Sequence, residues 1–355
     1  MTVHDPLIAA ASRTKSAIPD DAAMLRAAAD LTRELSTAKP AIYWPDMLAS
    51  ALVGYAALAG AMLTDHGALA VICGLVAMLA LYRAASFIHE LTHIRKGALP
   101  GFRFGWNLIV GIPLMIPSFL YEDVHTQHHA RTRYGTVNDP EYLPLALMKP
   151  WSLPLFILVA SLAPLGLILR FGVLTPLSLI FPPLRRKVVA EFSALSINPA
   201  YRRRPPEGEF ARQWAWQETG ACLFALALIG SIFAFGWQLL LTYMAVHSAM
   251  TVINQLRTLV AHLWENEGDA MTVTAQYLDS VNVPPPSPFA AIWAPVGLRY
   301  HALHHLLPSV PYHALGEAHH RLVATLAPDS PYHQGNYPGM WPLVGKIARS
   351  TMVKR

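Results

Sequence analysis

The chain is poor in charged residues. Asp, Glu, Lys and Arg make up only 14% of its 355 residues, whereas ordinary soluble domains contain about 25%. Hydrophobic residues make up 54%, and the mean hydropathy is +0.33. The first 20 residues also lack the basic and apolar regions of a secretory signal, so we expect no cleaved leader. This composition argues against a soluble protein and indicates an integral membrane protein.

Cysteine is almost absent. The two cysteines, Cys73 and Cys222, both lie in apolar runs, which excludes a disulfide framework and a metal site built from thiolates. The net charge is only +5, and the basic residues lie beside apolar segments. We therefore interpret them as residues that orient the chain and contact lipid headgroups, and we expect no nucleic-acid partner.

Four apolar stretches can cross a bilayer, which requires about 20 residues. They are residues 44–63, 68–88, 219–235 and 237–255, and short turns join them into two hairpins. Arg83, Arg95 and Lys96 accompany the end of the first hairpin, and Arg257 accompanies the end of the second. The positive-inside rule places these ends in the cytoplasm. Both termini are then cytoplasmic as well.

Two further apolar segments, 104–120 and 151–181, are interrupted by prolines, and we expect them to lie at the membrane interface. The predicted fold is an all-α integral membrane protein. It has four transmembrane helices in two hairpins, interfacial helices and a cytoplasmic helical cap. Residues 1–40 form a cytoplasmic N-terminal segment, 41–330 the membrane domain and 331–355 a cytoplasmic tail. Asp20 and Asp21 can cap a short helix that extends to about Ser36.

Histidine is concentrated in three clusters. The pattern HxxHH occurs twice, and a third cluster, HELTH, precedes both. These clusters contain His89, His93, His125, His128, His129, His301, His304 and His305. On a helix, residues i, i+3 and i+4 share one face, so each cluster can direct its imidazoles at one point. Neutral imidazole suits iron, zinc, copper and nickel, and eight such ligands are enough for two ions.

Residues 89–93 also match HExxH, the motif of zinc proteases in which the glutamate is the general base. A membrane zinc hydrolase would leave both HxxHH clusters unexplained. A bis-histidine haem would use only two axial ligands. In the interpretation that we prefer, Glu90 lies behind the metal ligands or on the surface, and its replacement by glutamine has a much milder effect than loss of His89 or His93.

The three clusters, their order and their positions after two membrane hairpins resemble the membrane-bound fatty acid desaturase superfamily over residues 40–330. Segments 254–262, 279–282 and 304–311 are also similar to segments of this family. The resemblance implies that all eight clustered histidines bind metal and that His262 is a ninth ligand. Some relatives have an asparagine four residues before that histidine. Thr258 stands there in this chain, so that role is not transferred.

The resemblance implies a di-iron centre that uses O2 to desaturate a fatty acyl chain, carried as an acyl lipid or a thioester. Lipid or alkyl hydroxylases and carotenoid ketolases belong to the same superfamily and remain alternatives. The zinc hydrolase and a non-enzymatic metal-binding protein are alternatives of other classes. Because the chain shows no haem-binding, flavin-binding or ferredoxin motif, we expect a separate electron donor, a ferredoxin or a cytochrome b5-like protein.

Some polar residues near these motifs have less certain roles. Asp139, Glu141 and Asp279 could orient ligand imidazoles through the second ring nitrogen, or could be solvated loop residues. The basic stretch 185–204 could dock an acidic donor, or could simply be a positive-inside loop. His247, inside the fourth span, could be functional or could be a buried, hydrogen-bonded histidine.

Overall fold

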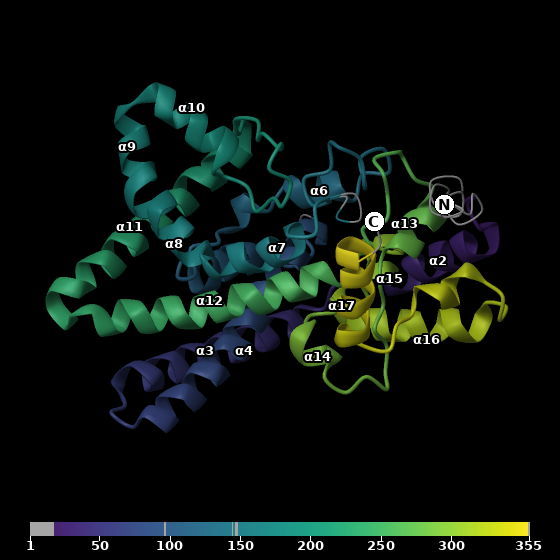
Figure 1. The fold of residues 1–355 in the computed structure, drawn as a ribbon, viewed down its shortest axis with the longest axis horizontal. Helices are drawn as coiled ribbons and strands as arrows, with labels where there is room; N and C mark the ends of the chain where they lie inside the picture. Colours follow the sequence, from purple (N-terminus) through teal and green to yellow (C-terminus); the bar gives the residue numbers. More distant parts are fainter. Residues whose placement is uncertain (1–17, 96, 144, 146–147, 354–355) are drawn as a thin grey trace, which may run out of the picture.

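A computed structural model describes residues 18–353 apart from 96, 144, 146 and 147. This part of the chain is mostly helical and contains no strand, only three isolated β-bridges (Figure 1). Residues 1–17 of the predicted N-terminal segment and the last two residues of the predicted tail lie outside the described residues, as does Lys96.

Two long hairpins form the apolar part of the fold. Helices α3 (Pro40–Leu63) and α4 (Gly67–His93) make the first, and α11 (Gly208–Phe235) and α12 (Trp237–Leu259) make the second. All four are long and apolar enough to cross a membrane, and no more than 33% of any of their apolar windows is buried inside the protein. Side chains such as Leu52 and Phe233 are exposed. Apolar helices with so much open surface are consistent with a multi-pass membrane protein.

Glycine shapes both hairpins. A Cβ at Gly54 of α3 would lie 2.6 Å from the Leu81 side chain of α4, so only glycine allows this close approach of the two helices. Gly236 has a φ of +70° between α11 and α12, a conformation that side chains other than glycine rarely adopt. Gly54 thus allows the close packing of α3 against α4, and Gly236 allows the predicted turn between α11 and α12.

The count of four spans is not confirmed, because a fifth segment also qualifies. Residues 163–180, which we expected at the interface, form α8 (Ala163–Ile168), the π-helix η5 (Leu169–Leu174) and α9 (Thr175–Ile180). Together they are a fifth candidate span by length and composition. Pro164 and Pro176 occupy the first turns of α8 and α9. Proline is tolerated there, so neither residue interrupts the segment as the sequence had suggested.

Shorter helices connect the hairpins. The segment predicted to be interfacial at 104–120 folds into α5 (Phe102–Trp106), η2 (Asn107–Gly111) and η3 (Ser118–Leu120), none of which is long enough to span. The other connecting and C-terminal helices are α6 (Val124–His128), α7 (Ser152–Ser161), α10 (Pro182–Glu191), α14 (Ala290–Trp293), α17 (Met340–Ala348) and η8 (Arg349–Val353).

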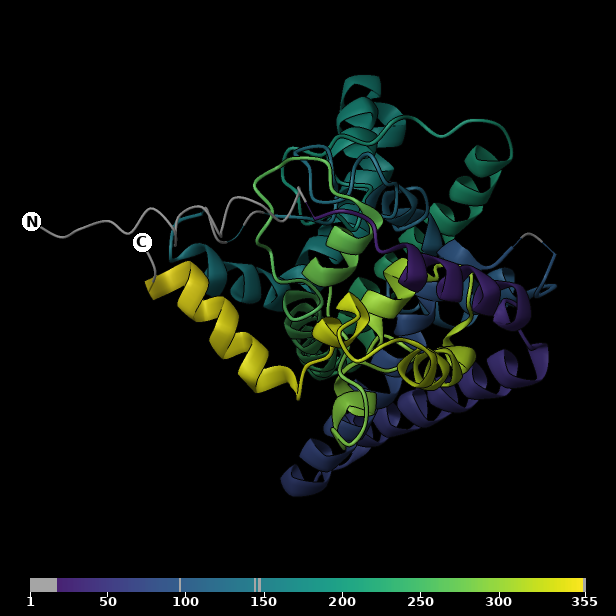
Figure 2. The ribbon, with the colours of Figure 1, turned by 90° about the vertical axis from the view of Figure 1, so that its right-hand side faces the viewer.

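A second group of helices lies at one end of the hairpins. It consists of α2 (Ala22–Leu35), α13 (Val273–Asp279), α15 (His301–Leu306) and α16 (Leu315–Thr325), which share a cluster of buried apolar residues. The short helices η6 (Tyr312–Ala314) and η7 (Pro331–Gly335) adjoin them. Figures 1 and 2 both show α2 beside α16. As predicted, Asp21 caps α2 and accepts a hydrogen bond from the Met24 amide at 2.7 Å.

The hairpin turns lie at the left of Figure 1, and the second group of helices lies at the right. Helices α4 and α12 therefore both end next to that group, and His93 is the last residue of α4. This arrangement brings residues that are more than 200 positions apart in the sequence to one end of the hairpins.

Candidate metal centre

All nine predicted histidines gather at this end of the fold, in two groups. The first group is His89, His93, His125, His129 and His304, and the second is His128, His262, His301 and His305. Within each group, one potential ligand nitrogen from every ring lies within 4.8 Å of the others. The rings of His129 and His305 stack at 4.2 Å between centroids, so the two groups adjoin.

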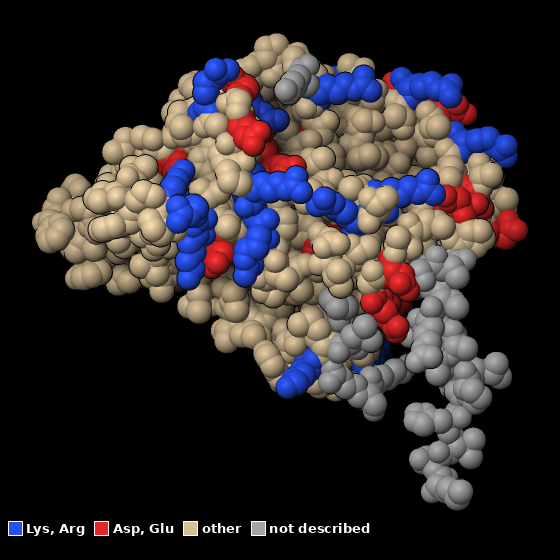
Figure 3. Space-filling view, turned by 90° about the horizontal axis from the view of Figure 1, so that it is seen from above, with Lys and Arg blue, Asp and Glu red and all other residues tan. Residues whose placement is uncertain are grey.

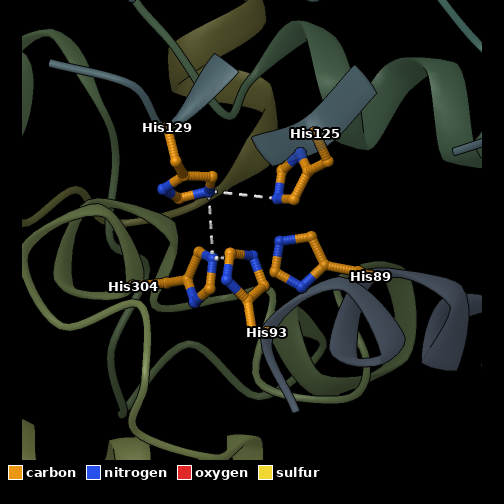
Figure 4. A group of neighbouring side chains, drawn as sticks. All are labelled: His89, His93, His125, His129 and His304. Carbon is orange, nitrogen blue, oxygen red and sulfur yellow. Dashed lines mark hydrogen bonds between the residues drawn. The ribbon is translucent and has the colours of Figure 1, made fainter. Parts of the chain in front are cut away.

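The rings point their Nε2 atoms at one another. In the first group, Nε2 of His304 lies 3.1 Å from that of His93 and 3.2 Å from that of His129, and Figure 4 shows the rings turned toward a common centre. In the second group, Nε2 of His301 lies 3.0 Å from that of His262 and 3.1 Å from that of His305. Several converging nitrogens cannot all be satisfied by sharing protons, whereas a metal ion accepts every lone pair.

Burial favours the neutral form of most of these imidazoles. It lowers the pKa of His129, His262 and His305 well below the usual value, and neighbouring histidines lower each further. The same holds for His125, His301 and His304. Since a metal binds the neutral imidazole, the environment favours the form that a ligand requires.

Two carboxylates hold ligand candidates by the second ring nitrogen. Asp139 lies 2.9 Å from Nδ1 of His128, and Glu141 lies 3.1 Å from Nδ1 of His125. Burial alone would lower the pKa of His128, but the charge and hydrogen bond of Asp139 outweigh burial and raise that pKa. A carboxylate at Nδ1 fixes the ring orientation and directs the Nε2 lone pair away from itself. The predicted orienting contacts of Asp139 and Glu141 are thus found.

The third predicted carboxylate acts through a tyrosine. Tyr134 donates a hydrogen bond to Asp279 at 3.1 Å, and its oxygen lies 2.8 Å from Nδ1 of His262. Burial raises the pKa of Tyr134 well above its usual value, so it remains protonated. With its proton given to Asp279, the tyrosine oxygen can accept from Nδ1–H of His262. The hydrogen-bond network therefore assigns the tautomer that leaves Nε2 of His262 for a metal.

Two tyrosines that orient ligand candidates were not among the predicted site residues. Tyr121 behaves like Tyr134, since its hydroxyl lies 2.8 Å from Nδ1 of His125 and donates to Glu141 at 2.9 Å. Tyr121 precedes His125 by one helical turn, which is the only pattern that could have suggested a contact. Tyr134 and His262 are 128 residues apart, so no spacing rule connects them.

The rings also contain nitrogens that no protein group satisfies. Both nitrogens of His89 are buried and have no hydrogen-bond partner among the residues that the structure describes. The same is true of Nδ1 of His301, His304 and His305. A buried polar atom without a partner is costly. For His89 an ion held by the first group would remove part of that cost. The donor set, the burial and the orienting carboxylates all fit two ions that prefer imidazole ligands.

Glu90 is buried and does not lie on the surface. Its Oε2 accepts hydrogen bonds from the Tyr43 hydroxyl and from the Tyr312 amide at 3.1 Å. It therefore links α4 to α3 and to the segment after α15, behind the first histidine group. A small pocket of about 30 Å³ adjoins Glu90 and His93 and is also lined by residues 308–311.

His247 lies outside the metal centre. It is buried in α12, and neither ring nitrogen has a hydrogen-bond partner in the described part of the chain. His247 is thus buried, as one of the two alternatives required, but the hydrogen bond that this alternative assumed is not found. His247 adjoins an apolar gap between α3, α4 and α12 that is too narrow for a water molecule.

Comparison with known proteins decides the family. The family model described as fatty acid desaturase matches residues 65–336. The chain belongs to this family. A curated relative, the ceramide hydroxylase of Caulobacter vibrioides (strain NA1000 / CB15N), is 49% identical over 337 residues, which cover 94% of this chain and 95% of the relative. No solved structure matches the chain with significance.

Family membership supports an oxidoreductase-type enzyme of lipid metabolism at a membrane, as the resemblance implied. It counts against the zinc hydrolase, because the whole set of histidine clusters lies within the matched residues.

Proposed function

We propose that this protein hydroxylates a long-chain ceramide-like lipid, using O2 and two external electrons at a di-iron centre. The relative named as a ceramide hydroxylase carries this proposal, since the two chains match over almost their full lengths. It favours the hydroxylase alternative over the desaturation that we expected first. The net reaction consumes one C–H bond, one O2, two electrons and two protons, and yields one alcohol and one water.

The nine histidines would hold the two irons, one ion in each group. When bound, the di-iron centre supplies the activation of O2 that C–H oxidation requires. Asp139 and Glu141 hold His128 and His125 in orientation, and Tyr134 does the same for His262. Most of the nine histidines are themselves buried, which limits the access of bulk water to the centre. The chain itself thus orients the ligands and shields the reacting carbon.

The proposal predicts a specific product. Purified protein, supplied with ceramide, labelled O2 and a reducing system, should form ceramide that contains one labelled oxygen atom and no new double bond. Mass spectrometry of the extracted lipid distinguishes this product from unsaturated ceramide, which contains no label and has lost two hydrogens. Unsaturated product alone would restore desaturation as the function, and unchanged ceramide would refute the proposed substrate class.

Replacement of Glu90 by glutamine should lower turnover by less than about threefold. The glutamine carbonyl can accept both hydrogen bonds that Oε2 of Glu90 now accepts from Tyr43 and Tyr312. A zinc hydrolase that used Glu90 as its general base would lose about 100-fold or more. Turnover of Glu90→Gln against the wild type, with His93→Ala as the inactive reference, separates the two functions.

The electron donor is proposed to dock at basic residues around α10. Figure 3 shows groups of Lys and Arg on the face that is uppermost in Figure 1, where α10 lies. Some residues of the basic stretch 185–204 are engaged within the protein and cannot contact a donor. Arg203 is buried and donates to the carbonyls of Ser193 and Glu122, and Arg185 is paired with Glu218 at 2.7 Å. Arg186, Lys187, Arg202 and Arg204 are exposed.

Reversal of Arg202 and Arg204 to glutamate should raise the KM for an acidic donor by on the order of tenfold at low salt, because steering by charge accelerates association. High salt should reduce the difference. Arg203 is left intact because it is part of the fold. Arg26→Glu, at an exposed arginine on α2, is the matched control. An equal KM for both variants would refute docking at this site.

A further inference from the structure

Arg257 is the only Asp, Glu, Lys or Arg residue in α12. A cation near the end of a span often marks the cytoplasmic side, and its side chain then reaches water. In the described part of the chain, its Nε is buried and has no hydrogen-bond partner. One Nη donates to the Asn254 side chain at 3.1 Å, and the guanidinium lies beside the Tyr82 hydroxyl of α4. Among the described residues, no carboxylate forms an ion pair with Arg257.

The position of Arg257 connects two parts of the molecule. Tyr243, His247, Met250, Asn254 and Arg257 follow one another at three- and four-residue intervals, so they share one face of α12. The first three of these residues pack with Leu58, Leu81 and Leu114 around an apolar gap that is too narrow for a water molecule. Met250 and Arg257 are seven residues apart, which is about 10 Å along a helix.

At its other end, this face reaches the metal centre. Burial lowers the pKa of His262 and His301, and after a neighbouring histidine the charge of Arg257 lowers both further. Two bound iron ions would add more positive charge close by. A guanidinium with an unsatisfied, buried donor is unfavourable in such a place unless an electron-rich group lies against it.

We propose that Arg257 is a positioning residue, which donates hydrogen bonds to an oxygen atom in the polar part of the lipid substrate. The oxygen belongs to an amide carbonyl or a hydroxyl group. This inference rests on the proposed function and extends it to the recognition of the substrate.

The arrangement also determines which part of the lipid reacts. A lipid held by its polar group at Arg257 has that group beside the metal centre. The carbons closest to the polar group are then the ones presented for oxidation.

Binding of a radiolabelled ceramide to iron-loaded protein without an electron donor tests this proposal, because no turnover can occur. Arg257→Gln should weaken binding by about tenfold or more, since hydrogen bonds from charged groups are the stronger kind. Binding of an alkane of matched chain length, which offers no oxygen, should not change. Arg257→Lys keeps the charge but loses the planar donor geometry, and it should bind ceramide with intermediate affinity. The exposed residue Arg212 on α11 provides the control Arg212→Gln.

With the donor added, the same variants should raise the KM for ceramide and spread the hydroxyl group over more carbons, while the iron content stays at the wild-type level. Unchanged ceramide affinity and unchanged product position in Arg257→Gln would overturn the inference and leave the proposed function standing. Loss of iron in both Arg257 variants would also overturn it, because the residue would then serve the metal centre. A wild type that neither binds nor oxidises ceramide would overturn both proposals.

Discussion

Replacement of His262 by alanine is expected to remove one of the two metal ions and to lower turnover by more than about 100-fold. Loss of a residue that only supports a metal ligand lowers metal affinity or activity by up to about 100-fold, so loss of a ligand itself should have a larger effect. His262 belongs to the group of four histidines, so its loss leaves three ligands for that ion. It is also the ligand candidate that Tyr134 and Ser280 hold at Nδ1, at 2.8 and 3.2 Å.

The two groups should respond differently. His93→Ala leaves four histidines in the group of five, which is enough for a complete set of protein ligands at many sites. We therefore expect His93→Ala to retain more iron than His262→Ala, although both should lose activity. Iron per chain, measured on protein purified without added metal, gives the comparison. The exposed His320 on α16 provides the control His320→Ala, which should keep full iron and activity.

An equal iron content per chain in His262→Ala and the wild type would show that His262 is not a ligand. Eight histidines would then remain as candidate ligands. Loss of both irons in either variant would show that the two groups bind metal as one cooperative unit. A milder variant, Tyr134→Phe, removes the hydroxyl that fixes the tautomer of His262 but leaves the ligand. It should weaken iron binding by about 10- to 100-fold, as expected for a partner outside the ligand set.

Most of the candidate ligands could be predicted from the sequence, because the spacing within each cluster places its histidines on one face of a helix. His125, His128 and His129 lie on one helical turn, and α6 together with its C-cap positions them. His262 has no such neighbour and could be found only through resemblance to the family. The structure brings it to Nε2 of His301 at 3.0 Å through a bridge between His262 and Ser280, which is a tertiary contact that no local pattern encodes.

The supporting residues were predicted less well. Asp139 and Glu141 follow the second cluster closely, so their contacts could be guessed from proximity. Tyr134 could not, because a tyrosine hydroxyl has no preferred spacing from its partner. Residues 163–180 were assigned to the interface for two reasons. Prolines interrupt the apolar run, and a net crossing would have put His129 and the basic stretch 185–204 on opposite sides of the membrane. The partner of Arg170 within that segment is Glu218 on another helix, and no sequence pattern links the two residues.

Replacement of Glu218 by leucine is expected to destabilise the protein by about 3–5 kcal/mol, the usual cost of leaving one member of a buried ion pair without its partner. Arg170 of η5 lies 2.6 Å from Glu218 of α11, and their side chains are only 4% and 6% exposed. Arg185 and Trp214 also donate to Glu218, at 2.7 and 2.9 Å. Without the carboxylate, the Arg170 charge would remain in an apolar region of the protein.

Unfolding of purified protein by SDS in mixed micelles measures this loss, and Glu209→Ala provides the control. Glu209 is in the same helix and pairs with Arg212 on the surface, where side chains are 59% and 77% exposed. An exposed pair of this kind contributes little, so the control should unfold like the wild type. Similar unfolding of Glu218→Leu and Glu209→Ala would refute the role of the buried pair.

The double variant Arg170→Met and Glu218→Leu should recover most of the stability lost in Glu218→Leu alone. A buried ion pair can often be replaced by apolar residues at no net loss, because the cost of desolvating two charges disappears with the charges. Recovery would show that the single variant is harmed by an uncompensated charge. The remaining deficit would come from Arg185 and Trp214, which lose Glu218 as an acceptor, and from the other bonds of Arg170, which donates to the Phe192 carbonyl at 2.8 Å and to the Ser193 hydroxyl at 2.9 Å. If the double variant is less stable than the single one, those bonds hold residues 169–174 in place more strongly than the ion pair does.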